Sequence, residues 1–154
     1  MSHFSTVELN IKDKELLVYA LTEMGFKVEE YDDPVDLLDW VSKVQKGFKA
    51  NVVVRKSANN NLLSDFGFLL KEGVYLGQVD PWALKSYYSE EFGRGYDAFN
   101  KHLKVSYAVE LIKRQAEEIH GSRVTCVREE GKTKVRVKLP TNKTRTQVSS
   151  RGTR

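Results

Sequence analysis

The chain has 154 residues, of which 40% are hydrophobic, and it carries a formal net charge of +4. This length and composition suit one compact core, and no apolar run approaches the roughly 20 residues that a membrane-spanning helix needs. The charge is uneven, because residues 1–100 carry 11 Lys and Arg against 16 Asp and Glu, whereas residues 101–154 carry 14 against 5.

The first half of the chain alternates between strand and helix signals. Apolar and polar residues alternate over 7–11, which predicts a half-buried strand. Asp13 then provides the N-cap of a helix that ends at Gly25, where a residue that tolerates positive φ is favoured. Residues 26–31 predict a short second strand.

A second helix is predicted over residues 34–46. Asp33 and Pro34 form a cap followed by proline at the first helical position. Apolar residues follow at helical spacing and end before Gly47; they are Leu37, Leu38, Val41 and Val44. The β-branched run 52–54 predicts the next strand.

The segment 64–82, SDFGFLLKEGVYLGQVDPW, contains the Asp-Phe-Gly triplet that holds magnesium in protein kinases. A kinase also needs a glycine-rich phosphate loop, a strand lysine and a catalytic loop, and the sequence has none of these. Phe66 and Phe68 are spaced to pack on one side of a strand, and Glu72-Gly73 is a turn dipeptide. We therefore predict a β-hairpin that Asp65 enters.

The second half begins with Asp80 and Pro81, a cap and proline that predict a short helix through Tyr87. The Gly-Arg-Gly segment 93–95 is interpreted as a hinge between helices. The longest helix is predicted from about residue 97 to residue 119.

A C-terminal hairpin is predicted over residues 122–128 and 132–139. Residues 140–154 lack large apolar side chains, which predicts a disordered basic tail.

Strands and helices are interspersed, and tight turns join neighbouring strands. This pattern favours an α+β fold, in which helices pack on one face of a mixed or antiparallel sheet. We expect a ferredoxin-like sandwich plus a C-terminal β-hairpin, with residues 1–139 forming a single α+β domain.

Cysteine use indicates the compartment. Cys126 is the only cysteine, so no intramolecular disulfide is possible, and its place in a predicted strand favours a small buried hydrophobe. The N-terminal residues alternate in polarity and do not show a basic region followed by an apolar stretch. We expect a reducing compartment, the cytoplasm or the plastid stroma.

Catalytic and metal-binding signals are weak. The three histidines, His3, His102 and His120, are widely separated, so we predict no metal site and no cofactor. The enzymatic alternative is a cleft that combines His102 with Asp65 and Asp80. Without a stronger constellation we predict no catalytic residues and a protein that is not an enzyme.

Aromatic residues gather in one segment, residues 82–96, on a short predicted helix and the glycine-rich connection after it. Part of such a cluster belongs to the core, but aromatic side chains also dominate the energetics of protein interfaces. We predict that this segment binds another protein. The predicted partner-binding residues are Trp82, Tyr87, Tyr88, Phe92 and Tyr96.

A row of cations follows the second strand of the C-terminal hairpin, with a spacing of about 6.6 Å from the strand rise. It consists of Lys132, Lys134, Arg136 and Lys138, and Lys143 and Arg145 follow on the tail. The row is suited to contact RNA or DNA, although Lys on an edge strand also prevents sheet-to-sheet aggregation. No aromatic residue interleaves the row to stack bases.

Three parts of the sequence are distinctive: the opening MSHFS, the first strand and helix to Gly25-Phe26, and Asp65-Phe66-Gly67-Phe68 with Tyr75 and Asp80. Together they resemble the hypothetical chloroplast reading frame thirty-five family. The resemblance covers residues 1 to about 115. It implies a single-domain soluble protein from cyanobacteria, algal plastids or their phages, and it implies no reaction. Phe66 stands where an aliphatic residue is expected, and the 34–46 segment and the basic tail are additions.

Two functions follow as expectations. The first is a non-enzymatic accessory or adaptor protein that acts by protein–protein contact through the aromatic segment. The alternative is a nucleic-acid-binding module that uses the basic hairpin and tail. No membrane partner is expected, and the sequence leaves the oligomeric state open.

Overall fold

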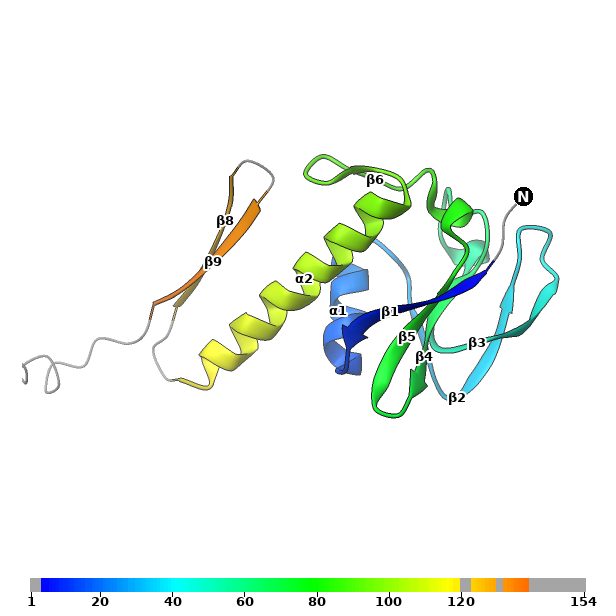
Figure 1. Cartoon of the computed structure of the whole chain (residues 1–154), viewed down its shortest axis with the longest axis horizontal. Helices are drawn as coiled ribbons and strands as arrows, with labels where there is room; N and C mark the ends of the chain where they lie inside the picture. Colours follow the sequence, from blue (N-terminus) through cyan, green and yellow to red (C-terminus); the bar gives the residue numbers. More distant parts are fainter. Residues whose placement is uncertain (1–3, 120–122, 130–131, 139–154) are drawn as a thin grey trace, which may run out of the picture. The chain divides into compact units, whose positions relative to one another are not determined.

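The computed structural model describes residues 4–119, 123–129 and 132–138, and the chain forms two compact units, residues 1–107 and 108–154 (Figure 1). The predicted α+β class is confirmed. The single domain over 1–139 stays a prediction, and the predicted tail lies outside the described residues.

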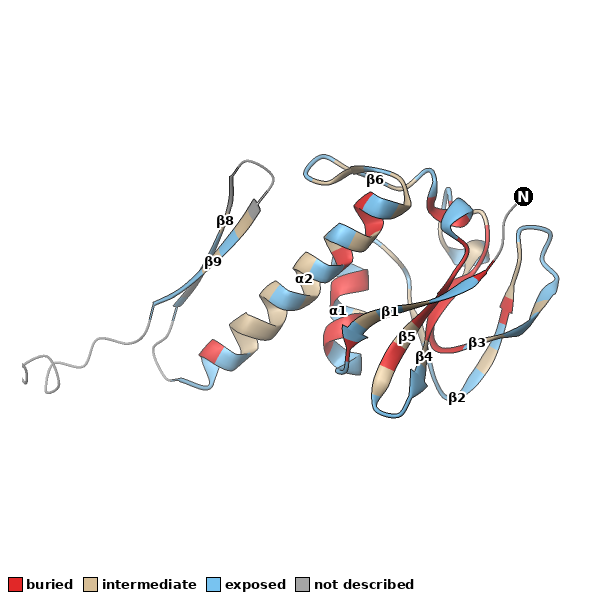
Figure 2. Cartoon of the chain, viewed as in Figure 1, coloured by how far each residue is buried: buried red, intermediate tan, exposed pale blue. Residues whose placement is uncertain are grey.

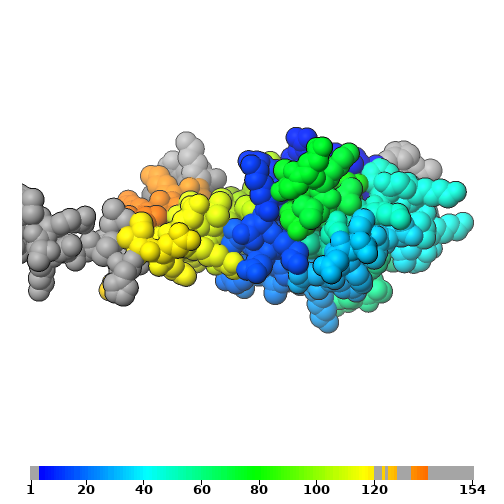
Figure 3. Space-filling model, turned by 90° about the horizontal axis from the view of Figure 1, so that it is seen from below, coloured from blue at the N-terminus to red at the C-terminus, as the bar shows by residue number. Residues whose placement is uncertain are grey.

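The first unit is built on a five-stranded sheet. Its strands are β1 (Ser5–Ile11), β2 (Glu29–Leu38), β3 (Val44–Val54), β4 (Phe66–Lys71) and β5 (Val74–Val79). Their order is β1-β5-β4-β3-β2, and every neighbouring pair is antiparallel. Figure 3 shows the green β4–β5 hairpin between the blue N-terminal segment and the cyan β2–β3 segment.

The predicted antiparallel sheet is thus confirmed, but the ferredoxin-like topology is not shown. Strands β2 to β5 form a meander of consecutive neighbours, and β1 adds to its edge beside β5. A ferredoxin-like sheet has two helical crossovers, and each joins consecutive strands that are not neighbours in the sheet. Here α1 connects β1 to β2, whereas turns connect β2 to β3 and β4 to β5, and a loop with η1 connects β3 to β4.

Helix α1 (Lys14–Glu23) follows the prediction closely. The Asp13 carboxylate accepts a hydrogen bond from the Leu16 N–H at 3.1 Å, which satisfies one donor of the first turn. Gly25 follows the helix with φ +99°. Helix α2 (Tyr96–Glu117) also confirms the predicted long helix, and its residues up to Tyr107 belong to the first unit.

The predicted helix over 34–46 is wrong, because these residues form the end of β2, a turn and the start of β3. The β2–β3 register shifts between Glu30 and Val35, and Asn51 fills the irregularity by donating to the carbonyls of Tyr31 and Asp32. Such a bulge accommodates Pro34, which has no N–H to donate. Pairing with β3 therefore overrides the helical spacing.

The predicted hairpin at Phe66–Val79 is confirmed as β4 and β5. Glu72 and Gly73 have φ values of +52° and +80°. A type I′ turn requires a positive φ at both of its central residues. Gly67 lets the strands approach closely, because a Cβ at this position would lie 2.5 Å from the Ala50 Cβ.

Short elements connect β3 to β4 and β5 to α2. They are η1 (Lys56–Ala58), η2 (Pro81–Leu84), β6 (Tyr88–Ser89) and β7 (Gly93–Arg94). The η2 turn confirms a short helical segment after Asp80 but ends before Tyr87. The Gly-Arg-Gly hinge is wrong, because Gly93 and Arg94 pair with β6 in a small hairpin.

The main core lies between the sheet and the helices, and Figure 2 shows buried residues concentrated there. In β3, Val52 and Val54 belong to this core, whereas Val53 joins a second apolar cluster with Leu37 and Phe4. Since successive strand residues point to opposite faces, the sheet buries side chains on both faces. Helices α1 and α2 contribute to the main core, as the prediction of helices on one face requires.

The carboxylate of Asp65 connects three segments of the first unit. It accepts hydrogen bonds from the Leu38 N–H at 2.9 Å, the Lys56 N–H at 2.8 Å and Arg55 Nη1 at 2.7 Å. Asp65 is only 2% exposed, and a buried carboxylate is stable only with such donors. Arg55 also contacts Glu29, and although burial lowers its pKa, the carboxylates of Asp65 and Glu29 together raise that pKa above its usual value.

The second unit contains the end of α2 and the hairpin of β8 (Arg123–Glu129) and β9 (Lys132–Lys138). This pairing confirms the predicted hairpin within the described residues. Cys126 lies in β8 but is exposed, so the prediction of a buried thiol is wrong. No helix in the described part of the chain is long and apolar enough to cross a bilayer.

We predict that Asp65→Ala lowers the free energy of unfolding by about 3 kcal/mol, because it removes the acceptor of two part-buried N–H groups and one of the acceptors of the Arg55 guanidinium. Urea denaturation measures this loss. Asp36→Ala is the matched control, since its carboxylate is 50% exposed and lies 3.8 Å from Lys49 Nζ. This exposed pair is expected to contribute less than about 1 kcal/mol. Equal losses for the two variants would contradict the role given to Asp65.

Candidate functional site

The structure divides the five aromatic residues that the sequence predicts for partner binding. Trp82 and Tyr88 are 38% and 59% exposed. Tyr87 and Tyr96 pack against the main core instead, and Phe92 stacks on His102 with ring centroids 4.7 Å apart. Two of the five therefore offer large exposed surfaces.

Trp40 completes this surface, and the sequence analysis missed it. Its ring meets that of Trp82 edge to face, with centroids 6.3 Å apart and an interplanar angle of 76°. Trp40 is 53% exposed. We call these two residues the tryptophan pair. The prediction of a helix over 34–46 was the reason, because it is the β2–β3 turn that places Trp40 beside Trp82 in η2.

Hydrogen bonds in two turns hold the tryptophan pair in place. Beside Trp40, the Asp39 carboxylate accepts from the N–H groups of Val41 and Lys43. Beside Trp82, the Asp80 carboxylate accepts from the Trp82 N–H at 3.0 Å. Both rings thus extend from turns that side-chain caps stabilise.

Two ammonium groups accompany the tryptophan pair. Lys85 Nζ lies 4.9 Å from the centroid of the Trp82 ring, within the range of a cation–π contact. Lys56 Nζ donates to the Trp40 carbonyl at 2.8 Å. The exposed aromatic surface therefore has a positive border.

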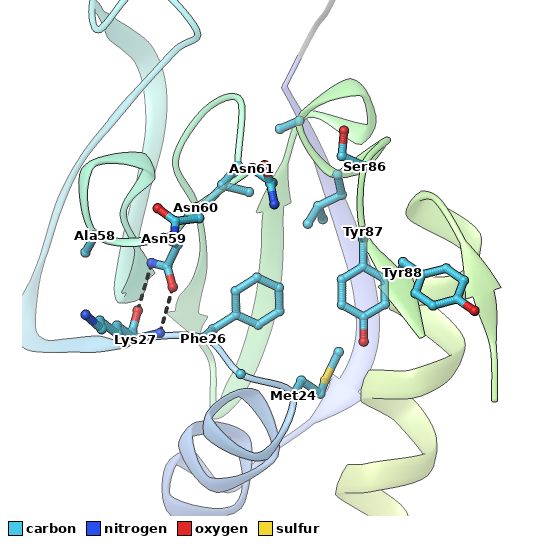
Figure 4. Close-up of a pocket in the computed structure, with 14 residues that line it drawn as sticks. Met24, Phe26, Lys27, Ala58, Asn59, Asn60, Asn61, Ser86, Tyr87 and Tyr88 are labelled. Carbon is cyan, nitrogen blue, oxygen red and sulfur yellow. Dashed lines mark hydrogen bonds between the residues drawn. The ribbon is translucent and has the colours of Figure 1, made fainter. Parts of the chain in front are cut away.

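A cavity of about 460 Å³ lies beside the same segment. We call it the asparagine pocket, because Asn59, Asn60 and Asn61 form one wall. Figure 4 shows this wall facing Tyr87, with Phe26 and Met24 between the two. Among the described residues that line it, none is acidic, and Lys27 is the one cation. Its volume is in the usual range of about 300–1,000 Å³ for ligand pockets.

Ring contacts position the aromatic side of the pocket. The rings of Phe26 and Tyr87 are nearly parallel, at 18°, and each meets Phe99 edge to face. The Tyr87 hydroxyl forms a short hydrogen bond with His102 Nδ1, and burial raises the pKa of Tyr87 to about 12.

The residues of the enzymatic alternative are already engaged in structural hydrogen bonds. Asp65 binds backbone N–H groups and Arg55, Asp80 caps η2, and His102 binds Tyr87. No group of three or more His, Cys, Asp or Glu side chains among residues 4–119, 123–129 and 132–138 could hold a metal ion. Neither Asp lines either of the two described cavities.

The predicted cation row lies on β9. Lys134, Arg136 and Lys138 are exposed, and the register pairs Arg136 with Thr125 and Lys138 with Arg123. Paired residues share a face in an antiparallel ladder, so Arg123 adds a cation to the row. Lys132 lies in β9 with its side chain not described, and Lys143 and Arg145 lie outside the described residues.

No protein-family model, curated protein or solved structure matches the chain. The resemblance to the chloroplast reading frame family therefore stays a prediction.

We predict that the tyrosine titration of the wild type contains a component with a midpoint of about 12, due to Tyr87, that Tyr87→Phe removes. Absorbance of the phenolate measures it, and Tyr88→Phe is the control for a neighbouring exposed ring. Because folding raises this pKa above 10.0, the associated stability is complete below pH 10 and is lost as the pH rises through about 12. An identical titration in Tyr87→Phe would contradict the burial of this hydroxyl.

Proposed function

We propose that this protein is a non-enzymatic adaptor that binds another protein through the tryptophan pair. The observation that carries the proposal is the edge-to-face contact of two exposed Trp rings from segments 42 positions apart in sequence. Exposed Trp side chains are costly in water and are enriched among the residues that dominate binding free energy. The resemblance noted above favours a photosynthetic lineage or its phages, and the lone cysteine favours a reducing compartment.

The positive border indicates the chemistry of the partner. Lys85 and Lys56 place ammonium groups beside Trp82 and Trp40, and the nearby Asp39 carboxylate is occupied by backbone N–H groups. A complementary segment is acidic and carries an aromatic or aliphatic side chain that packs on the rings. Acidic charge accelerates association, and the apolar anchor provides most of the affinity.

We predict that Trp40→Ala and Trp82→Ala each weaken binding of the partner at least about thirtyfold, as expected for an interface hot spot of about 2 kcal/mol. A partner captured by the purified protein from a cyanobacterial or plastid lysate is first identified by mass spectrometry. Its affinity for each variant is then measured by calorimetry. Lys85→Gln is expected to slow association and to reduce its dependence on salt.

Tyr19→Ala is the matched control, because Tyr19 is another exposed aromatic residue, 40% exposed, on helix α1. It is expected to leave the affinity unchanged. A partner that binds both Trp variants as tightly as the wild type would refute the adaptor surface proposed here.

A second candidate function, nucleic-acid binding, is favoured by the register of the C-terminal hairpin. Arg123 and Lys138 are directly paired, and like charges at such positions are destabilising unless an anion lies nearby. A phosphate backbone that follows the row relieves this repulsion. The second unit then contributes salt-dependent affinity without base specificity.

We predict that replacing Lys134, Arg136 and Lys138 by Gln makes the salt dependence of single-stranded RNA binding shallower. The slope of log K against log salt is expected to change by about 2, since each lost phosphate contact removes about 0.7. Fluorescence anisotropy measures it. The control replaces Lys12, Lys46 and Lys71, exposed lysines of the first unit, with the same charge change. Equal slopes in the two triple variants would exclude the row as the binding site.

A further inference from the structure

The asparagine pocket combines an aromatic surface with a surface of side-chain amides. One side is aromatic, and its Phe26 and Tyr87 rings each pack edge to face on Phe99. The other side carries three consecutive carboxamides on the loop between η1 and β4. Flat apolar faces and amide edges are complementary to a planar heteroaromatic ring.

The three carboxamides have different tasks. The Asn59 side chain holds the loop, because it accepts from the Lys27 N–H at 2.8 Å and donates to the Lys27 carbonyl (Figure 4). It also donates to the Arg55 carbonyl. Within the described residues, the side chains of Asn60 and Asn61 have no hydrogen-bond partner. The loop is thus fixed by one amide and presents the next two.

We propose that the asparagine pocket binds a nucleobase, with Asn60 and Asn61 on its polar edge and the aromatic side against its ring. A carboxamide matches the paired donor and acceptor on the edge of adenine, and stacking on Phe or Tyr is favourable for every base. The lining residues are compatible with the attached phosphate, because they include Lys27 and no carboxylate among those described.

This inference is independent of the adaptor function, since the tryptophan pair does not line the pocket. The same base chemistry has two sources, a free nucleotide or a nucleotide within an RNA strand. If the ligand is a free nucleotide, the monomer binds as tightly as a strand of the same base. If the ligand is a strand, the strand binds more tightly than the monomer. Both sources place a base against the same amides.

The test uses the full chain with adenosine 5′-monophosphate, ribose 5-phosphate and hexa-adenylate RNA as probes. We expect the side-chain amide signals of Asn60 and Asn61 in NMR spectra to shift with the nucleotide but not with ribose 5-phosphate. Asn61→Gly is expected to weaken nucleotide binding at least about tenfold, the loss of one base-edge contact. Asn61 has φ +65°, so glycine removes the amide without backbone strain.

Asn10→Gly provides the matched control, because Asn10 also has a positive φ, +57°, and does not line this pocket. It is expected to leave nucleotide binding unchanged. Binding of ribose 5-phosphate as tight as that of the nucleotide would overturn base recognition. So would equal affinities in the two glycine variants, or the absence of nucleotide binding at millimolar concentration.

Discussion

The structure of the first unit depends on the hydrogen bonds that the buried Asp65 carboxylate accepts. They join the end of β2 and the start of η1 to the residue that precedes β4. Trp40 follows Leu38 by two residues, and the asparagine loop follows Lys56 by three. Segments of both the tryptophan pair and the asparagine pocket therefore lie close in sequence to residues that bind this carboxylate. Asp65 belongs to the triplet that resembles a kinase metal ligand, but here it accepts hydrogen bonds from backbone donors. A buried carboxylate needs such donors, because burial removes its water.

The segment around η2 serves two surfaces at once. Trp82 points outward and contacts Trp40, whereas Tyr87, five residues later, packs on the core and lines the asparagine pocket. The Leu63 N–H donates to the Ala83 carbonyl at 3.3 Å and so connects this segment to the asparagine loop. A partner at the tryptophan pair and a ligand in the pocket would contact one continuous stretch of chain.

The wrong helix at 34–46 shows why local pattern was insufficient there. Leu37, Leu38, Val41 and Val44 fit a helical period, but Val35 and Leu37 also fit the strand period and pack in the second apolar cluster. The choice depends on Asn51 and Asp65, which bind the backbone of β2 from 19 to 27 positions away. Such long-range hydrogen bonds leave no mark on the local sequence. The same error hid Trp40 from the predicted site.

The sequence alone determined the elements whose signals are local. These include the Asp13 cap of α1, the Glu72-Gly73 turn, the long helix α2 and the hairpin with the cation row. Only the tertiary structure decided the strand order, the meeting of Trp40 with Trp82 and the opposition of the asparagine loop to Tyr87. Caps, turns and periodicity are encoded within a few residues, because they depend on neighbouring backbone groups. Sites form where distant segments pack, and that packing is decided by the whole core.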